Sequence, residues 1–205
     1  NKSAVSIDWP RNARDDKMIE FQRSVVRASA ATGASTGLYI DSSVNLRFRG
    51  STANGGLVGQ SYGIWIYGTN AVNPIVDLQD SIISAGSMPL VVSNVALSSV
   101  SGFKRNLWHY INAGDNVIDN NGALITKMTM QSSFQADMIT SPWGDARFGN
   151  PQFQLDGVHL TMSSSSARNQ ALVCWGTDGG MSPFDIDGTP NGIDGICDLG
   201  GDEYQ

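Results

Sequence analysis

The stretch Leu38-Tyr39-Ile40-Asp41-Ser42-Ser43-Val44-Asn45-Leu46 contains two apolar triplets separated by three polar residues. Within each triplet the apolar residues recur at every second position, which is the period of a β-strand with one buried face. The polar break is too short to reverse the chain and bury both triplets in a hairpin core. Its length suits a corner between two strands that lie on successive faces of one coil.

The same pattern, with small variations, recurs along the chain at 19–26, 76–83, 90–97 and 153–160. The stretch 124–128 is a candidate further copy, and 63–67 adds another strand signal. Segments rich in Gly, Ser and Asn, such as 51–56, would carry the chain around a third side. Uneven spacing between copies is typical of a solenoid whose loops differ in length. We therefore predict an all-β chain that forms a single-stranded right-handed parallel β-helix with a continuous core of stacked apolar residues.

An antiparallel sandwich or jelly roll is the competing fold, because it also contains short alternating strands. Against it, hairpin dipeptides such as Asn-Gly lie mostly outside the repeated pattern. We expect an N-terminal cap or linker at 1–17, the β-helix at 18–173 and a Gly/Asp-rich C-terminal cap at 174–205. The aromatic stretch around Trp143 interrupts the pattern and is expected to form a long loop.

Composition limits the partners of the chain. Of its 205 residues 16% are charged, below the roughly 25% of average soluble domains, and the net charge is −6. Nucleic acid is not expected as a partner, because phosphate binding requires a basic surface. The basic residues between Arg11 and Arg27 leave an anionic polysaccharide open, although a solvated surface is the preferred explanation for them. No membrane span is expected, and any secretion signal would lie upstream of Asn1.

Two cysteines, Cys174 and Cys197, flank a Gly/Asp-rich segment near the C-terminus. Two widely separated cysteines do not form a zinc site, which requires four ligands at short spacings. A disulfide that closes this loop is the preferred interpretation, and it implies an oxidising compartment. Two unpaired, buried thiols are the alternative.

The final residues Cys197-Asp198-Leu199-Gly200-Gly201-Asp202-Glu203-Tyr204 are unusual in composition. They resemble the ending Cys-Asp-(Ile/Leu)-Gly-x-x-Glu-(Tyr/Phe) of secreted bacterial right-handed parallel β-helix proteins of the pectate-lyase-like superfamily. The resemblance is specific over the last thirty residues and loose over the rest of the chain. It implies an extracellular or cell-surface location, and it says little about activity.

The C-terminal segment also offers hard oxygen ligands that are separated by Gly turns. Calcium takes six to eight such ligands, so calcium is a candidate cofactor. The spacing is not that of an EF-hand. The alternative is that these side chains cap turns through hydrogen bonds to the backbone. The candidate ligands are Asp185, Asp187, Asn191, Asp194 and Asp198.

No catalytic motif is recognisable, and the catalytic residues remain unassigned. Polysaccharide lyases and hydrolases also use this fold, and a hydrolase requires two carboxyl groups that face one groove. A lyase requires clustered acids that hold calcium and a basic residue, for which Arg47 and Arg49 near Asp41 are candidates. Whether the protein is an enzyme is left open by the sequence, and a protein without enzymatic activity is the favoured expectation.

Aromatic residues supply a binding hypothesis. Trp65 and Tyr67 alternate along one stretch, and Trp108 and Tyr110 alternate along another. An outward ladder of these rings, with Trp143 nearby, would stack on sugar rings or on a partner protein, whereas inward rings would fill a wide core.

We therefore predict an extracellular structural or adhesive module, which assembles with itself end to end or laterally, as in a filament, or binds a surface polysaccharide. A polysaccharide-binding or polysaccharide-degrading protein and a trimeric phage-type spike are the alternatives.

Overall fold

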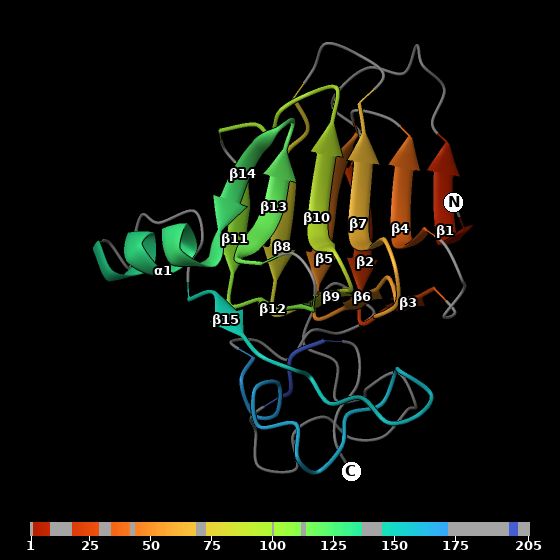
Figure 1. Cartoon of the computed structure of the whole chain (residues 1–205), viewed down its shortest axis with the longest axis vertical. Coiled ribbons are helices and arrows are strands. Elements are labelled where there is room, and N and C mark those ends of the chain that lie inside the picture. Colours follow the sequence, from red (N-terminus) through yellow and green to blue (C-terminus); the bar gives the residue numbers. More distant parts are fainter. Residues whose placement is uncertain are drawn as a thin grey trace.

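A computed structural model describes residues 2–8, 18–28, 34–41, 44–68, 73–99, 101–111, 114–136, 145–171 and 197–200. Three sheets run along the molecule (Figure 1). The six strands of sheet A, in spatial order, are β1 (Lys2–Asp8), β4 (Ser35–Asp41), β7 (Ser61–Tyr67), β10 (Met88–Ser93), β13 (Asn116–Asn120) and β14 (Ala123–Thr126). Sheet B contains β2 (Met18–Gln22), β5 (Asn45–Arg49), β8 (Val76–Gln79) and β11 (Gly102–Lys104). Sheet C contains β3 (Val25–Arg27), β6 (Thr52–Asn54), β9 (Ile82–Ala85), β12 (Leu107–Tyr110) and β15 (Arg147–Phe148).

Each of the first four coils places one strand in each sheet, so that neighbours in a sheet are three strands apart in the sequence, with β13 and β14 as the exception. All pairings within the sheets are parallel except β13 with β14. The chain rises in sheet A, crosses to sheet B, descends, and returns along sheet C, which makes the coil right-handed (Figure 1). The prediction of a parallel β-helix is confirmed.

In-register apolar ladders form the core between the three sheets. In sheet A, Leu38, Ile64, Leu90 and Ile118 are successive partners, and each is fully buried. In sheet B, Phe48 pairs with Leu78, and Leu78 pairs with Phe103. In sheet C the corresponding ladder is Val26, Ala53, Ile83, Trp108 and Phe148. The apolar residues that alternate in the sequence therefore form the inward face of each of these strands.

The corner between sheets B and C is built from one repeated turn. A residue with positive φ precedes each sheet C strand, at Arg23, Gly50, Asp80, Arg105 and Asp145. In the first three of these turns, the backbone amide of the next residue donates to a side chain in the following coil. The amide of Ser24 donates to Ser51 Oγ at 3.1 Å, the amide of Ser51 to Ser81 Oγ at 3.3 Å, and the amide of Ser81 to Asn106 Oδ1 at 3.1 Å. These bonds satisfy backbone groups that the corner buries.

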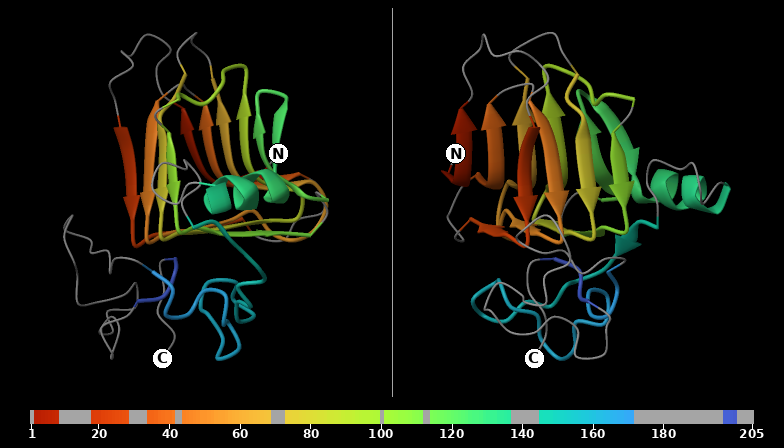
Figure 2. Two further views of the ribbon diagram at one scale, coloured as in Figure 1. Left: turned by 90° about the vertical axis from the view of Figure 1, so that its left-hand side faces the viewer. Right: turned by 180° about the vertical axis from the view of Figure 1, so that it is seen from behind.

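Two predicted boundaries differ from the structure. Residues 2–8, expected in a cap or linker, form β1, the first strand of sheet A. Cys197–Gly200, expected within an end cap, lie against the outer face of sheet C, along one side of the solenoid (Figure 2). The reason is a second apolar cluster, in which Leu199 packs with Ile82 and Leu107 of sheet C. The other residues of 174–205 lie outside the described residues.

The repeated pattern also predicts two segments wrongly. Residues 153–160 form an isolated antiparallel bridge between Phe153 and Leu160, and residues 95–97 follow β10 without forming a strand. The candidate copy at 124–128 forms most of β14, which reverses direction, and the start of helix α1 (Lys127–Ala136). Among the described residues, no helix is both long and apolar enough to cross a membrane.

Candidate binding surface on sheet A

An aromatic cluster lies on the outer face of sheet A. Tyr39 of β4 and Trp65 of β7 are register partners, and their rings meet edge to face with centroids 5.7 Å apart. The Tyr62 ring lies 5.0 Å from the Trp65 ring. The Trp65 indole Nε1 donates a hydrogen bond to Ser93 Oγ at 3.1 Å. These contacts fix the orientation of the indole before any ligand arrives, which lowers the entropic cost of binding.

A shallow hollow of about 540 Å³ adjoins this cluster. Its floor includes Val91 of β10, which pairs with Trp65 on one side and with Asp119 of β13 on the other. A small side chain between a large ring and a carboxylate leaves the depression open. The lining residues are Gln60, Tyr62, Trp65, Ser87, Met88, Val91, Ser93, Asn116 and Asp119. An aromatic surface edged by hydroxyl, amide and carboxylate groups is chemically suited to a polar ring-shaped ligand.

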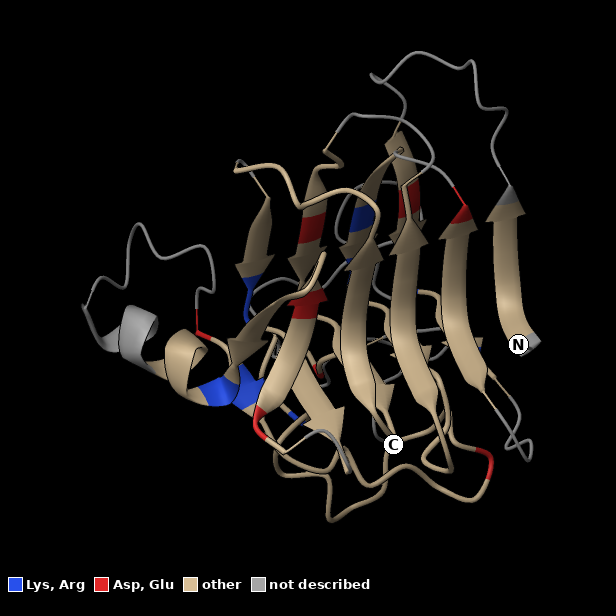
Figure 3. Cartoon of the chain, turned by 45° about the horizontal axis from the view of Figure 1, so that its top comes forward, with Lys and Arg blue, Asp and Glu red and all other residues tan. Residues whose placement is uncertain are grey.

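Charge is distributed unequally between the sheets. The strands β4, β7, β10 and β13 contain no Lys or Arg, and Figure 3 shows no blue segment on them. Sheet B instead carries ion pairs on its outer face. Arg47 lies 3.6 Å from Glu20 and 3.4 Å from Asp77, and Arg49 Nη2 lies 2.9 Å from the same Asp77 oxygen.

Arg47 and Arg49 were candidates for a lyase base. Their guanidinium groups neutralise carboxylates in the adjacent coils, which is a structural role. Among the described residues, one carboxyl group, that of Asp119, lines the hollow on sheet A, and one, that of Asp115, lines a second hollow. The described linings therefore do not supply the pair of carboxyl groups that glycoside hydrolysis requires.

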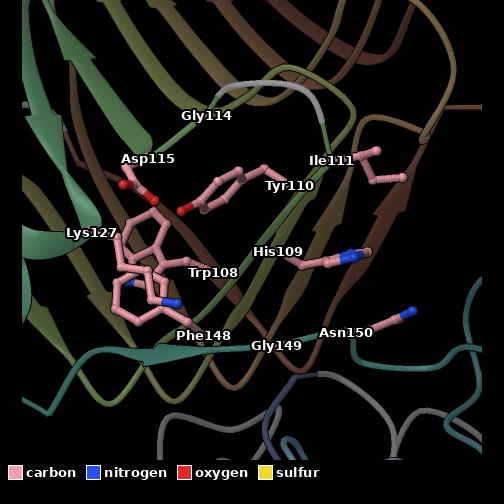
Figure 4. Close-up of a pocket in the computed structure, with 10 residues that line it drawn as sticks. All are labelled: Trp108, His109, Tyr110, Ile111, Gly114, Asp115, Lys127, Phe148, Gly149 and Asn150. Carbon is pink, nitrogen blue, oxygen red and sulfur yellow. The ribbon is translucent and has the colours of Figure 1, made fainter.

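The second hollow, of about 450 Å³, lies at the C-terminal end of the solenoid (Figure 4). Tyr110 and Asp115 point toward one another there, and Lys127 lies beside Phe148, with its Nζ 5.3 Å from the ring centroid. Trp108 also lines this hollow, although only 1% of its surface is exposed and its ring packs against Phe103. Of the two alternatives that the sequence leaves open, Trp108 therefore follows the core-filling one, because its side chain continues the inward ladder of sheet C.

Two titratable groups in this hollow have shifted pKa values. Burial, and then the negative charge of Asp115, raise the pKa of Tyr110 above its ordinary value. Burial lowers the pKa of His109, whose Nδ1 lies 3.0 Å from Ser84 Oγ. His109 points to the opposite side of β12 from Tyr110, so the two groups do not act on one ligand (Figure 4). We therefore place the stronger candidate site on sheet A.

The calcium prediction falls mainly outside the described residues, because Asp185, Asp187, Asn191 and Asp194 are not described. Asp198 is described and is buried, and its Oδ1 accepts a hydrogen bond from the amide of Asn169. A hydrogen bond from a side chain to the backbone is the structural role that the sequence analysis gives as the alternative to metal binding. No group of three His, Cys, Asp or Glu side chains that would hold a metal occurs among the described residues. Calcium remains a prediction, which melting with and without a chelator tests.

Cys197 is buried and disulfide-bonded, whereas Cys174 lies outside the described residues, so the pairing stays as predicted from the sequence. Trp143 also lies outside them. Tyr67, with 36% of its surface exposed, lies on the same strand as Trp65 but outside the lining of the hollow.

Sequence reasoning found Trp65 and missed Tyr39, Tyr62 and Ser93. The signal for Tyr39 was present, because it occupies the middle position of the opening triplet, the position that faces outward. The approach of Ser93 and Asp119 to Trp65 depends on the register between coils, which only the coordinates supply.

No protein-family model matches the chain, and neither the curated proteins nor the solved structures compared with it give a significant match. The functional argument therefore depends on the geometry of the site.

Proposed function

We propose that the chain is an extracellular structural and adhesive β-helix module that binds a polysaccharide on the outer face of sheet A. The observation that carries the proposal is the fixed Trp65 ring beside a polar-edged hollow. Pyranose rings have an apolar C–H face and polar edges. They would stack on the indole and bond to the surrounding hydroxyl, amide and carboxylate groups.

Two further observations support the location. The ending Cys197-Asp198-Leu199-Gly200 resembles that of secreted β-helix proteins. A disulfide at Cys197 is typical of an oxidising compartment. A rigid solenoid with long, regular sheet faces suits a role in which the fold presents a surface rather than encloses a reaction.

The test is oligosaccharide binding by wild-type protein and by Trp65→Ala, measured by isothermal titration calorimetry with a panel of hexasaccharides. We expect wild-type protein to bind at least one member, and Trp65→Ala to bind it roughly tenfold more weakly, from the loss of about 1.5 kcal/mol of ring contact. Tyr67→Ala is the matched control, because it removes an exposed ring from the same strand outside the hollow, and it should change affinity less than twofold. Equal binding by wild type and Trp65→Ala would refute the proposal.

Self-assembly is a second candidate function, and the partly buried apolar residues at the N-terminal end of the solenoid favour it. The edge strands there are β1, β2 and β3, and the inward residues Val5, Ile7, Ile19 and Phe21 are only partly buried. The opposite end differs, because antiparallel β14 ends sheet A and Met130 of α1 is fully buried against the core. Unlike ends favour pairing of two N-terminal ends over a head-to-tail filament. Mass measurement in solution should then give a dimer, whereas a trimer would support the spike alternative.

A further inference from the structure

Asp119 is the only charged residue among the described residues that line the sheet A hollow. Its Oδ1 accepts a hydrogen bond from the amide of Gly122 at 2.7 Å, which ties the carboxylate to the turn between β13 and β14. The other oxygen, Oδ2, makes no hydrogen bond among the residues that the structure describes. One oxygen is thus held in place and the other remains available to a ligand.

Asp119 and Trp65 face each other across β10. Both pair with Val91, so they lie two strand spacings apart, or roughly 10 Å along the sheet. An aromatic face and a carboxylate on opposite sides of a small apolar floor favour a ligand with one apolar face and a positive charge. A cation near the Tyr62 and Trp65 rings is also attracted by their electron-rich faces.

We propose that the ligand is a polysaccharide with protonated amino groups, whose amino-sugar units place the ammonium at Asp119 and the ring against Trp65. The inference rests on the proposed function and names the ligand class for the same site. The face around the hollow would repel an anionic polymer such as a polyuronate. The strands of this face supply no Lys or Arg to balance the charge of such a polymer.

The test uses two probes with the same sugar backbone, a β-1,4-glucosamine hexamer and its N-acetylated counterpart, in which acetamide groups replace the charged amines. Binding is measured at a pH at which the free amines are protonated and at two salt concentrations. We expect the amine form to bind about three- to tenfold more tightly, as one charge-assisted bond to a half-buried carboxylate allows. That preference should shrink at high salt, which screens the pair.

Asp119→Asn is the decisive variant. Asparagine keeps the oxygen that accepts from Gly122, so the turn is retained while the charge is lost. The variant should melt like wild type, bind the acetylated hexamer unchanged and lose the preference for the amine form. Asp41→Asn is the matched control, because it removes the same charge from the same sheet outside the hollow, and it should keep the preference.

The outcomes separate the two proposals. Binding of both hexamers with equal affinity, or a preference that survives Asp119→Asn, would overturn the amino-sugar inference and leave polysaccharide binding standing. Binding of neither hexamer, together with binding of other hexasaccharides, would do the same. Failure of every oligosaccharide would overturn both. Tighter binding of a lysine hexapeptide than of the glucosamine hexamer would overturn the saccharide class in favour of a protein partner.

Discussion

His109 shows how the fold constrains a single residue. Its side chain is 8% exposed, and Ser84 Oγ lies 3.0 Å from its Nδ1, on the outer side of sheet C. Burial favours the uncharged ring and therefore lowers the pKa of His109 in the folded state. The unfolded chain has no such restriction, so below an ordinary pKa of about 6.5 it binds a proton that the folded state resists.

We expect the free energy of unfolding to fall as the pH drops below about 6.5, because the unfolded state takes up more protons than the folded state there. The loss ends once the pH has passed below the folded pKa of His109. His109→Asn keeps an acceptor for Ser84 and has no titratable ring, so its stability should depend less on pH in this range. Urea unfolding between pH 4.5 and 7.5 measures the difference.

His159→Asn provides the control for that experiment. It replaces the other histidine, which is more exposed and lies beside Asp156, and it should retain the loss of stability on acidification. The same slope in wild type and His109→Asn would contradict the assignment.

Among the elements, the β13–β14 hairpin has two roles. It ends the parallel stacking of sheet A, and its turn holds Asp119. Its central residues, Asn121 and Gly122, have φ values of 54° and 88°, as a two-residue hairpin turn requires. Glycine reaches such a φ without steric cost, whereas other L-residues do not.

Gly122→Ala should therefore lower the free energy of unfolding by about 1–2 kcal/mol. A Cβ at Gly122 would meet nothing within 4 Å, so the penalty is one of backbone conformation alone. Gly102 of β11 has equally open surroundings and no positive φ, and Gly102→Ala should change stability by less than about 0.5 kcal/mol. Equal effects of the two substitutions on chemical denaturation would refute this account.

At this scale the sequence predicted the strands with alternating apolar residues and missed a strand without them. The alternation of Leu38 with Ile40 and of Val76 with Leu78 correctly indicated β4 and β8, because burial of one face imposes a period of two. The segment at 52–54 was read as a connection, yet it forms β6. Thr52 and Asn54 lie on its outer side and are buried by the C-terminal region.

The candidate site was also predictable only in part, because alternation shows which face of a strand a residue occupies and does not show which residues of other coils lie beside it. An exposed ring at Trp65 follows from alternation along one strand. The approach of Asp119 to that ring depends on the 26-residue and 28-residue offsets between successive coils, which are Ile64 to Leu90 and Leu90 to Ile118. Loop lengths set those offsets, and the alternation of apolar residues does not predict the conformation of loops.

At the scale of the whole molecule, stability is the sum of contacts between neighbouring coils. An interior coil has a neighbour on each side, whereas a terminal coil has one. In sheet A, Ile7, Ile40 and Ile66 are successive partners, and Ile66 also pairs with Val92, so the same isoleucine side chain occurs in a terminal coil and in interior coils. Ile40 and Ile66 are fully buried, and Ile7 is only partly buried.

Ile66→Ala should lower the free energy of unfolding by about 2–5 kcal/mol, since it opens a cavity between two occupied neighbours. Ile7→Ala should cost less than half as much, because solvent already reaches the outer side of its coil and less apolar contact is lost. Guanidinium unfolding at low protein concentration measures both, and unchanged m-values would show that the coils still unfold together. Equal losses at the two positions would mean that the N-terminal coil is covered in solution. A loss at Ile7 that grows with protein concentration would then identify a second copy as the cover.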